Sequence, residues 1–127
     1  MTDLSPYARL LGVTLEQDES DAPVLLMPFG DEVVGRPGFL HGGAIAGLLE
    51  LAALATLRHV LGDGGGRIKP LTQTVDYRRN GRDHSTRAAG TVTRLGGRIA
   101  NVDATAWQDD RERPIAAARM TFLLERD

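Results

Sequence analysis

The 127-residue chain contains no cysteine. Without cysteine a protein forms no disulfide, offers no thiolate nucleophile and has no sulfur ligand for a metal. The first residues also lack the basic start and the apolar stretch of a secretory leader. From these absences we expect a cytoplasmic protein whose chemistry does not depend on sulfur.

An excess of one charge is also missing, since 15 basic residues stand against 17 acidic ones. This balance does not favour nucleic acid as a partner, because phosphate backbones select strongly basic surfaces. Lysine is nearly absent, and arginine supplies 14 of the 15 basic residues. Arginine binds phosphates with two parallel hydrogen bonds. Arg94 and Arg98, which lie on either side of Gly96-Gly97, are therefore candidate phosphate ligands, although each could equally be a solvated surface residue.

No repeat, linker or change in composition divides the chain, so we expect one domain over residues 1–127. One apolar run, residues 42–61, is long enough to span a membrane. Glu50 lies at its centre, glycines crowd its start, and strand-like segments follow it. These features favour a helix in the core of a protein over a membrane span, because a charge inside a bilayer is costly.

The run from Gly42 to Leu61 has good helix formers, no proline and apolar residues on every side. This is the pattern of a helix that is buried all round. Glu50 is the one charge in its middle, and its neighbours on the same face are alanine, glycine and leucine. A carboxylate is almost never buried without a partner. Glu50 is therefore expected either to take up a proton or to meet a group from outside this helix.

Two consecutive glycines, Gly42 and Gly43, open this helix. Each costs about 1 kcal/mol relative to alanine in a helix interior, so their use suggests that another group approaches the backbone closely. The first N–H groups of a helix have no internal partner and lie at the positive end of the helix dipole. They could hold an oxyanion that develops during a reaction. The simpler interpretation is that both glycines serve packing alone.

The spacing of these two features predicts a dimer. Glu50 lies eight residues beyond Gly42, which is roughly 12 Å along a helix that rises 1.5 Å per residue. One side chain does not close that gap. Both groups could serve one carbonyl if a second copy of the helix ran antiparallel, so that Glu50 of one subunit faced Gly42 of the other. We therefore expect an obligate dimer with two symmetric sites.

The rest of the sequence follows mostly an alternating pattern. The expected elements are a short amphipathic helix at residues 5–11 and strands at residues 24–27, 71–78, 84–95, 98–108 and 115–124. Turns are expected at Gly64–Gly66, Asn80-Gly81 and Gly96-Gly97. The last two strands place mostly small apolar residues on one face. Long antiparallel strands of this kind form a curved sheet that can wrap one apolar helix, which is an α+β arrangement.

A helix inside an antiparallel sheet, entered through Leu-His-Gly-Gly, resembles the hotdog-fold acyl-CoA thioesterases, and specifically the branch related to phenylacetate degradation. The resemblance covers the whole chain in architecture. In motif it rests on His41-Gly42-Gly43 with an acid nine positions after the histidine, and Tyr77-Arg78 supports it. It implies that Glu50 is the nucleophile or general base and that the Gly42 N–H polarises the thioester carbonyl, the two coming from opposite subunits. His41 would orient other groups.

The chain departs from the family pattern at two positions. Family members usually carry Asn or Gln six residues before the histidine, where this chain has Gly35, followed by Arg36. Members that use Glu can also carry Thr one turn after it, where this chain has Leu54, and Thr72, Thr74 or Thr56 could supply the hydroxyl instead. The catalytic candidates are Glu50, Gly42 and His41, and the substrate-binding candidates are Gly43, Gly35, Arg36, Thr72, Thr74, Arg94 and Arg98.

The resemblance implies hydrolysis of an acyl-CoA thioester to a carboxylic acid and free CoA, without a metal or an organic cofactor. It also implies a homodimer that assembles into a dimer of dimers. A hydratase or dehydratase is one alternative, because the Pro-Gly-Phe-Leu approach to the helix also resembles the hotdog dehydratases of fatty-acid synthesis. A non-catalytic protein that binds acyl-CoA is the other. The sequence does not specify the acyl group.

Overall fold

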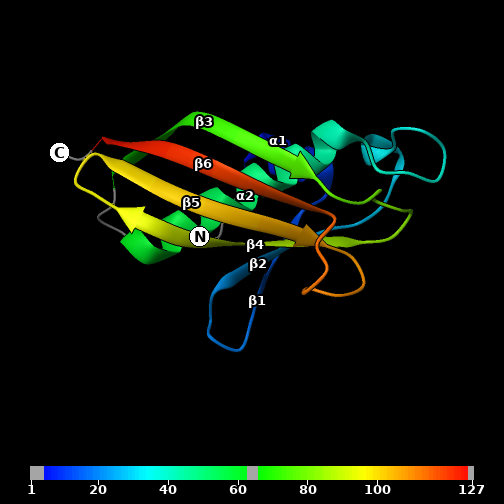
Figure 1. Cartoon of the computed structure of the whole chain (residues 1–127), viewed down its shortest axis with the longest axis horizontal. Coiled ribbons are helices and arrows are strands. Elements are labelled where there is room, and N and C mark those ends of the chain that lie inside the picture. Colours follow the sequence, from blue (N-terminus) through cyan, green and yellow to red (C-terminus); the bar gives the residue numbers. More distant parts are fainter. Residues whose placement is uncertain (1–4, 63–65, 126–127) are drawn as a thin grey trace.

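The computed structural model describes residues 5–62 and 66–125 (Figure 1). Every helix and strand expected from the sequence is present, and the Gly64–Gly66 turn lies mostly outside the described residues. The elements in chain order are α1 (Pro6–Leu11), β1 (Thr14–Gln17), β2 (Pro23–Met27), a short 3-10 helix (Asp31–Val33), α2 (Gly42–Leu61), β3 (Arg67–Tyr77), β4 (Thr86–Leu95), β5 (Ile99–Trp107) and β6 (Ala116–Glu125).

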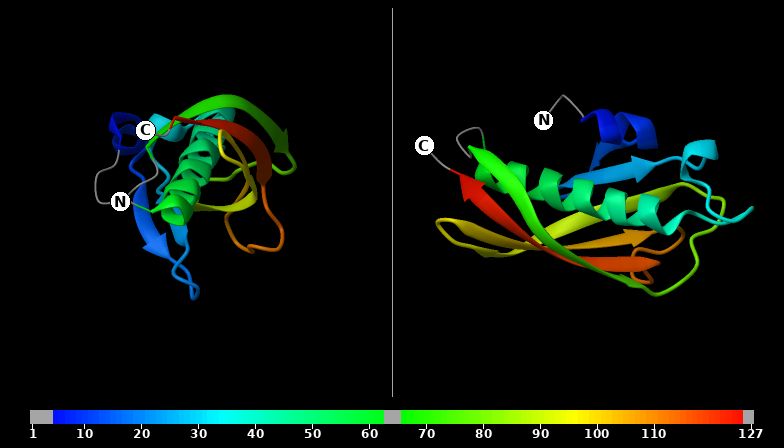
Figure 2. Two further views of the ribbon diagram at one scale, coloured as in Figure 1. Left: turned by 90° about the vertical axis from the view of Figure 1, so that its left-hand side faces the viewer. Right: turned by 90° about the horizontal axis from the view of Figure 1, so that it is seen from above.

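The six strands form one antiparallel sheet in the order β1-β2-β4-β5-β6-β3. The sheet curls around α2, which lies along its inner face (Figure 2). The short helix α1 packs against α2 and against the 3-10 helix. The chain therefore has the hotdog arrangement, and the α+β fold predicted from the sequence is confirmed.

The core lies between α2 and the inner face of the sheet. Leu48 and Leu49 of α2 are fully buried, and burial of a leucine side chain stabilises a fold by about 1.5–3 kcal/mol. The predicted inner faces of β5 and β6 are also buried and consist largely of alanine, which lets the helix lie close to the sheet. Although α2 is long and apolar enough to cross a membrane, its burial against the sheet identifies it as a core helix.

One of the predicted turns is wrong and one is confirmed. β4 and β5 form the expected hairpin around Gly96-Gly97. The Asn80-Gly81 pair makes no such turn, because β3 pairs with β6 and the segment after β3 crosses to β4 in the middle of the sheet. The Gly81 carbonyl instead accepts a hydrogen bond from the Leu40 N–H at 2.9 Å. A Cβ at position 81 would lie 2.7 Å from the Leu40 side chain, so close approach explains this glycine.

β3 forms one edge of the sheet and is 11 residues long. It contains a β-bulge at Leu71, where the pairing with β6 shifts by one residue. Beyond the bulge, Gln73, Val75 and Tyr77 pair with residues of β6 whose side chains face the core. An edge of this length exposes a row of backbone N–H and C=O groups that can pair with another strand.

The contact between Gly81 and Leu40 yields the first prediction. Gly81→Ala forces a methyl group against a buried leucine, and overpacking of this kind costs about 1–3 kcal/mol. The Tm of this variant should fall by several degrees in thermal unfolding followed by circular dichroism. Gly97→Ala is the matched control, because a Cβ at position 97 would meet no atom within 4 Å. Equal Tm values for the two variants would contradict the assigned close approach.

Candidate active site

His41 caps the N-terminus of α2. Its backbone is extended, and its Nδ1 accepts a hydrogen bond from the Gly43 N–H at 2.9 Å. The His41 N–H donates to the carbonyl of Val33 at 2.7 Å, which fixes the chain as it enters the helix. Because Nδ1 already accepts, the neutral ring carries its proton on Nε2. The structure thus gives His41 an orienting role at the start of the helix.

The first helical N–H groups are not all used in capping. His41 accepts from Gly43 through its side chain, and its carbonyl accepts from Ala44 and Ile45. The Gly42 N–H has no acceptor within the described part of the chain, and it points out from the positive end of α2. A Cβ on Gly43 would lie 3.0 Å from the His41 ring, so the cap itself favours glycine at that position. Gly42 therefore offers the free donor that the sequence suggested.

Gly35 lies against the backbone of His41. A Cβ at position 35 would stand 3.1 Å from the His41 Cα and 3.3 Å from its nitrogen, which is tighter than ordinary van der Waals contact. A larger residue at this position would therefore push on the start of α2. This packing accounts for glycine at the place where the thioesterase pattern has Asn or Gln.

Glu50 lies two turns after Gly42, on the less buried side of α2. This side carries half-buried residues, with Ala46 and Gly47 one turn before Glu50 and Leu54 one turn after it. Glu50 itself is half-buried, and no residue that the structure describes forms an ion pair or a side-chain hydrogen bond with its carboxylate. Tyr7 of α1 packs over Gly47, where a Cβ would clash with the tyrosine ring.

Two side chains of β3 reach the backbone of α2. The Tyr77 hydroxyl donates to the carbonyl of Gly42 at 2.9 Å, and Gln73 Nε2 donates to the carbonyl of Ala46 at 3.0 Å. Gln73 therefore lies at the turn of α2 that carries Glu50. The sequence analysis missed this residue as a site candidate. The sequence did contain a signal for it, because the alternating pattern of the strand places the Gln73 carboxamide on the same side as the apolar residues Leu71 and Val75.

The loop before α2 brings two arginines onto one aromatic ring. Residues 36–39 form a type II turn, with Pro37 first, Gly38 at φ +83° second, and a hydrogen bond from the Phe39 N–H to the Arg36 carbonyl. The Arg36 guanidinium lies 4.5 Å from the Phe39 ring centroid. The Arg82 guanidinium lies 5.0 Å from the same centroid. Neither arginine has a carboxylate partner among the described residues.

The other predicted arginines lie elsewhere. Arg94 and Arg98 are in and beside the β4–β5 hairpin, at the end of the sheet where β3 begins and β6 ends. Figure 2 shows this hairpin at the C-terminal end of α2. Gly42 is the first residue of α2, and Arg36 lies in the loop before it. Within one chain, Arg94 and Arg98 are therefore far from Gly42.

Thr72 and Thr74 lie on the outer face of the sheet. They line a groove of about 400 Å³ whose other lining residues are Thr93, Asn101, Asp103, Arg119, Met120 and Thr121. Because Gln73 between them faces α2, neither threonine can supply a hydroxyl beside Glu50 of its own chain. Thr56 also fails in that role, since its hydroxyl is buried toward Gly90 of β4. The suggestion that one of these threonines supplies a hydroxyl beside Glu50 of the same chain is therefore wrong. The periodicity of the strand and of the helix points all three side chains elsewhere.

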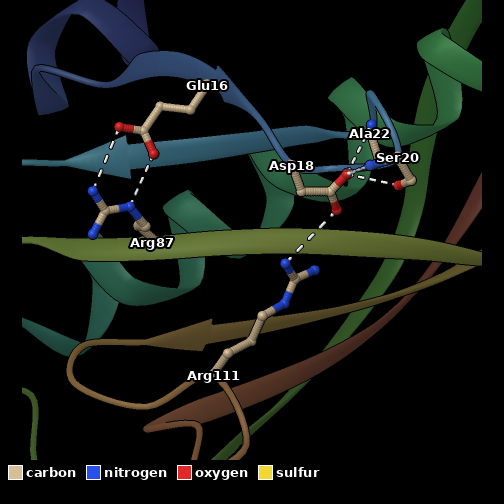
Figure 3. Close-up of polar contacts among 6 residues, drawn as sticks. All are labelled: Glu16, Asp18, Ser20, Ala22, Arg87 and Arg111. Atoms are coloured by element: carbon tan, nitrogen blue, oxygen red, sulfur yellow. Dashed lines mark hydrogen bonds and ion pairs between the residues drawn. The ribbon is translucent and has the colours of Figure 1, made fainter.

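Ion pairs of the described residues lie away from this region (Figure 3). Glu16 of β1 pairs with Arg87 of β4 at 2.9 Å, and Asp18 lies 3.7 Å from Arg111. The hydroxyl and backbone amide of Ser20 both donate to Asp18 and hold the pKa of this carboxyl below its ordinary value. These contacts tie the β1–β2 hairpin to the sheet and leave the arginines near Gly42 unpaired.

Comparisons with known proteins agree with this fold. The Thioesterase superfamily profile matches residues 37–115. The medium/long-chain acyl-CoA thioesterase YigI of Escherichia coli K12 is 29% identical over 94% of this chain and 85% of its own length. A solved structure from Chromobacterium violaceum is 36% identical, with a TM-score of 0.73 over 94% of this chain and 83% of the other.

Two further structures are similar in fold. A Bacillus halodurans protein solved with CoA has a TM-score of 0.87 at 20% identity, covering 100% of this chain and 83% of its own. A phenylacetic acid degradation-related protein from Ralstonia eutropha has a TM-score of 0.84 at 19% identity, covering 97% and 92% of the two chains. The profile match spans Phe39 and Arg82, all of α2 and the strands β3, β4 and β5. The chain belongs to the thioesterase superfamily.

Proposed function

We propose that this protein hydrolyses acyl-CoA thioesters to a free carboxylic acid and CoA. The observation that carries the proposal is the free Gly42 N–H at the start of α2, combined with an unpaired, half-buried Glu50 on the same helix. A free N–H at a helix N-terminus stabilises an oxyanion, and a carboxylate acts as a base or nucleophile. The 29% identity to an acyl-CoA thioesterase supports CoA as the carrier of the acyl group.

The chemistry follows from these two groups. The Gly42 N–H donates to the thioester carbonyl oxygen, which gains negative charge as a nucleophile attacks the carbon. Glu50 either takes a proton from the attacking water or attacks the carbon itself to form an anhydride that water then opens. The C–S bond breaks in either route, the sulfur leaves as a thiolate that takes up a proton, and the acyl group leaves as a carboxylate.

A dimer is part of this proposal. Glu50 and Gly42 of one chain are roughly 12 Å apart along α2, because a helix rises 1.5 Å per residue. The long edge of β3 offers a place for two copies to pair antiparallel about a twofold axis. β3 also carries the side chains that contact α2 near Gly42 and Ala46. Pairing of two β3 strands would bring the two helices near the same axis, with Glu50 of one chain facing Gly42 of the other.

The dimer can be tested at β3. Sedimentation equilibrium should give twice the chain mass for the active protein. Leu71, which is 47% exposed on the edge strand, is replaced by lysine, since an edge lysine opposes strand pairing. Association and thiol release should fall together. Leu95→Lys is the control, because Leu95 is 45% exposed but lies outside β3. A fully active monomer would refute the shared site.

The role of Glu50 is tested with Glu50→Gln. The change keeps shape and removes basicity, so kcat for thiol release from acyl-CoA should fall by about 100-fold or more. The Tm and the dimer should persist, because a neutral amide costs less than a carboxylate among alanine and glycine neighbours. The assay uses a panel of short, medium, long and aromatic acyl-CoAs and follows free thiol.

The same panel separates the alternatives. Thiol release by the wild-type protein supports hydrolysis. A change in enoyl absorbance without thiol would indicate a hydratase, and binding without either signal would indicate a non-catalytic protein. A stable Glu50→Gln dimer with wild-type turnover would remove Glu50 from the mechanism.

The loop arginines are proposed to bind the phosphates of CoA. Arg36 and Arg82 lack carboxylate partners and stand near the end of α2 that carries Gly42. Replacing both by alanine should raise KM for acyl-CoA by at least about 10-fold, since a charge-assisted hydrogen bond contributes roughly 1.5–3 kcal/mol. KM for an acyl-pantetheine, which lacks the nucleotide, should not change.

Arg94 and Arg98 give the matched comparison at the other end of α2. The double alanine variant of this pair should change KM for acyl-CoA only if the hairpin of one chain reaches the nucleotide bound by the other. An equal rise in KM for acyl-CoA and acyl-pantetheine in the Arg36, Arg82 variant would exclude a phosphate role for that pair.

A further inference from the structure

Gln73 occupies an unusual place on β3. It pairs in register with Met120, whose side chain is buried in the core, and it is itself half-buried facing α2. Its neighbours on the same side of the strand beyond the bulge are Val75 and Tyr77. A carboxamide has two N–H donors and one accepting oxygen. Among the described residues its hydrogen-bond partner is the carbonyl of Ala46, and its oxygen stays open to solvent.

This single bond fixes the orientation of the carboxamide. A backbone carbonyl only accepts hydrogen bonds, so the atom of Gln73 that faces Ala46 is the nitrogen and the oxygen points away from it. The same Ala46 carbonyl is the acceptor of the Glu50 N–H, because α-helical bonds run from residue i to residue i−4. The Gln73 amide is therefore two hydrogen bonds from the backbone nitrogen of Glu50.

Gln73 and Glu50 each offer an acceptor at this turn of α2, because Gln73 is bonded to Ala46 and Glu50 lies one turn after Ala46. Two acceptors do not bond to each other, but one water molecule can donate a hydrogen to each. A water held in this way would turn its lone pairs away from both acceptors, toward a thioester bound on that side.

From this geometry we infer that Gln73 is a positioning residue for the hydrolytic water, which it holds together with Glu50. The inference rests on the proposed function and selects its general-base route. Glu50 takes one proton from the water as the water oxygen bonds to the thioester carbon. The C–S bond then breaks, and the thiolate leaves with the proton that Glu50 held. Gln73 gives up no proton and keeps its hydrogen bond to Ala46.

Gln73→Met tests the inference, because methionine keeps the length of the side chain and loses the accepting oxygen. The kcat for thiol release should fall by roughly 10- to 100-fold with KM nearly unchanged, the pattern of lost orientation of a reacting group. In a Glu50→Gln background, the same change should cost less than about 3-fold, because both residues would act on one water. Gln73→His keeps one donor for the Ala46 carbonyl and one acceptor for the water, and it should retain more kcat at pH 8 than Gln73→Met.

A structural role would give a different result. Gln108 makes hydrogen bonds to the carbonyls of Arg82 and His84 and to the Thr86 hydroxyl, so Gln108→Met is a glutamine control for lost stability. If Gln73 only anchors β3 to α2, Gln73→Met and Gln108→Met should lose the same fraction of kcat for the same fall in Tm.

The outcomes separate the two proposals. Wild-type turnover in Glu50→Gln overturns the function assigned to Glu50. If Glu50→Gln has a low kcat but Gln73→Met has the wild-type kcat, only the role of Gln73 is overturned. The same holds if the fold-losses of kcat in the two single variants multiply fully in the double variant. Should Gln73→Met fail to fold, a kcat of Gln73→His equal to that of a folded Gln73→Leu would overturn it as well.

Discussion

The packing of α2 against the inner face of the sheet is the constraint on which the rest of the structure depends. The helix can be enclosed because alanine is the most frequent residue at the inner positions of β4, β5 and β6 and lets the helix lie close to the sheet. Close packing of this kind leaves little freedom for the helix to shift. A rigid helix fixes the separation between the N–H groups at its start and the carboxylate in its middle. The two groups of the proposed site are thus held apart within one chain, which is why that proposal includes a second copy.

The same packing explains why polar chemistry sits on one side of α2. The side toward the sheet is apolar, while the side away from it carries Glu50 among residues too small to cover it. β3 closes part of this open side and contributes a hydroxyl and a carboxamide to the helix backbone. The edge strand is therefore both part of the enclosure and a source of polar groups. Changes on this strand therefore affect both the enclosure of α2 and the polar contacts to its backbone.

The sequence predicted those parts of the molecule that local patterns encode. The bounds of α2 follow from a run without proline that ends in glycine, and the inner faces of β5 and β6 follow from strict alternation. His41, Gly42 and Glu50 were found because they lie on one helix with fixed spacing. Asn80-Gly81 was misjudged because a turn signal does not reveal whether the flanking strands are neighbours. Gln73 and the pairing of Arg36 with Arg82 across Phe39 depend on contacts between distant segments, which no local period reports.

The bulge at Leu71 decides which side chains of β3 meet the helix. Before the bulge, Ile68 pairs with Leu124 and faces the core. After it, Gln73, five residues beyond Ile68, pairs with Met120 and faces the same side. An odd interval between two inward positions is impossible in a regular strand, whose sides alternate strictly. The extra residue thus resets the phase of the strand midway. If the extra residue were deleted, either Ile68 or Gln73 could face the inside of β3, but not both. The side chains that β3 presents to the helix therefore depend on the length of the strand.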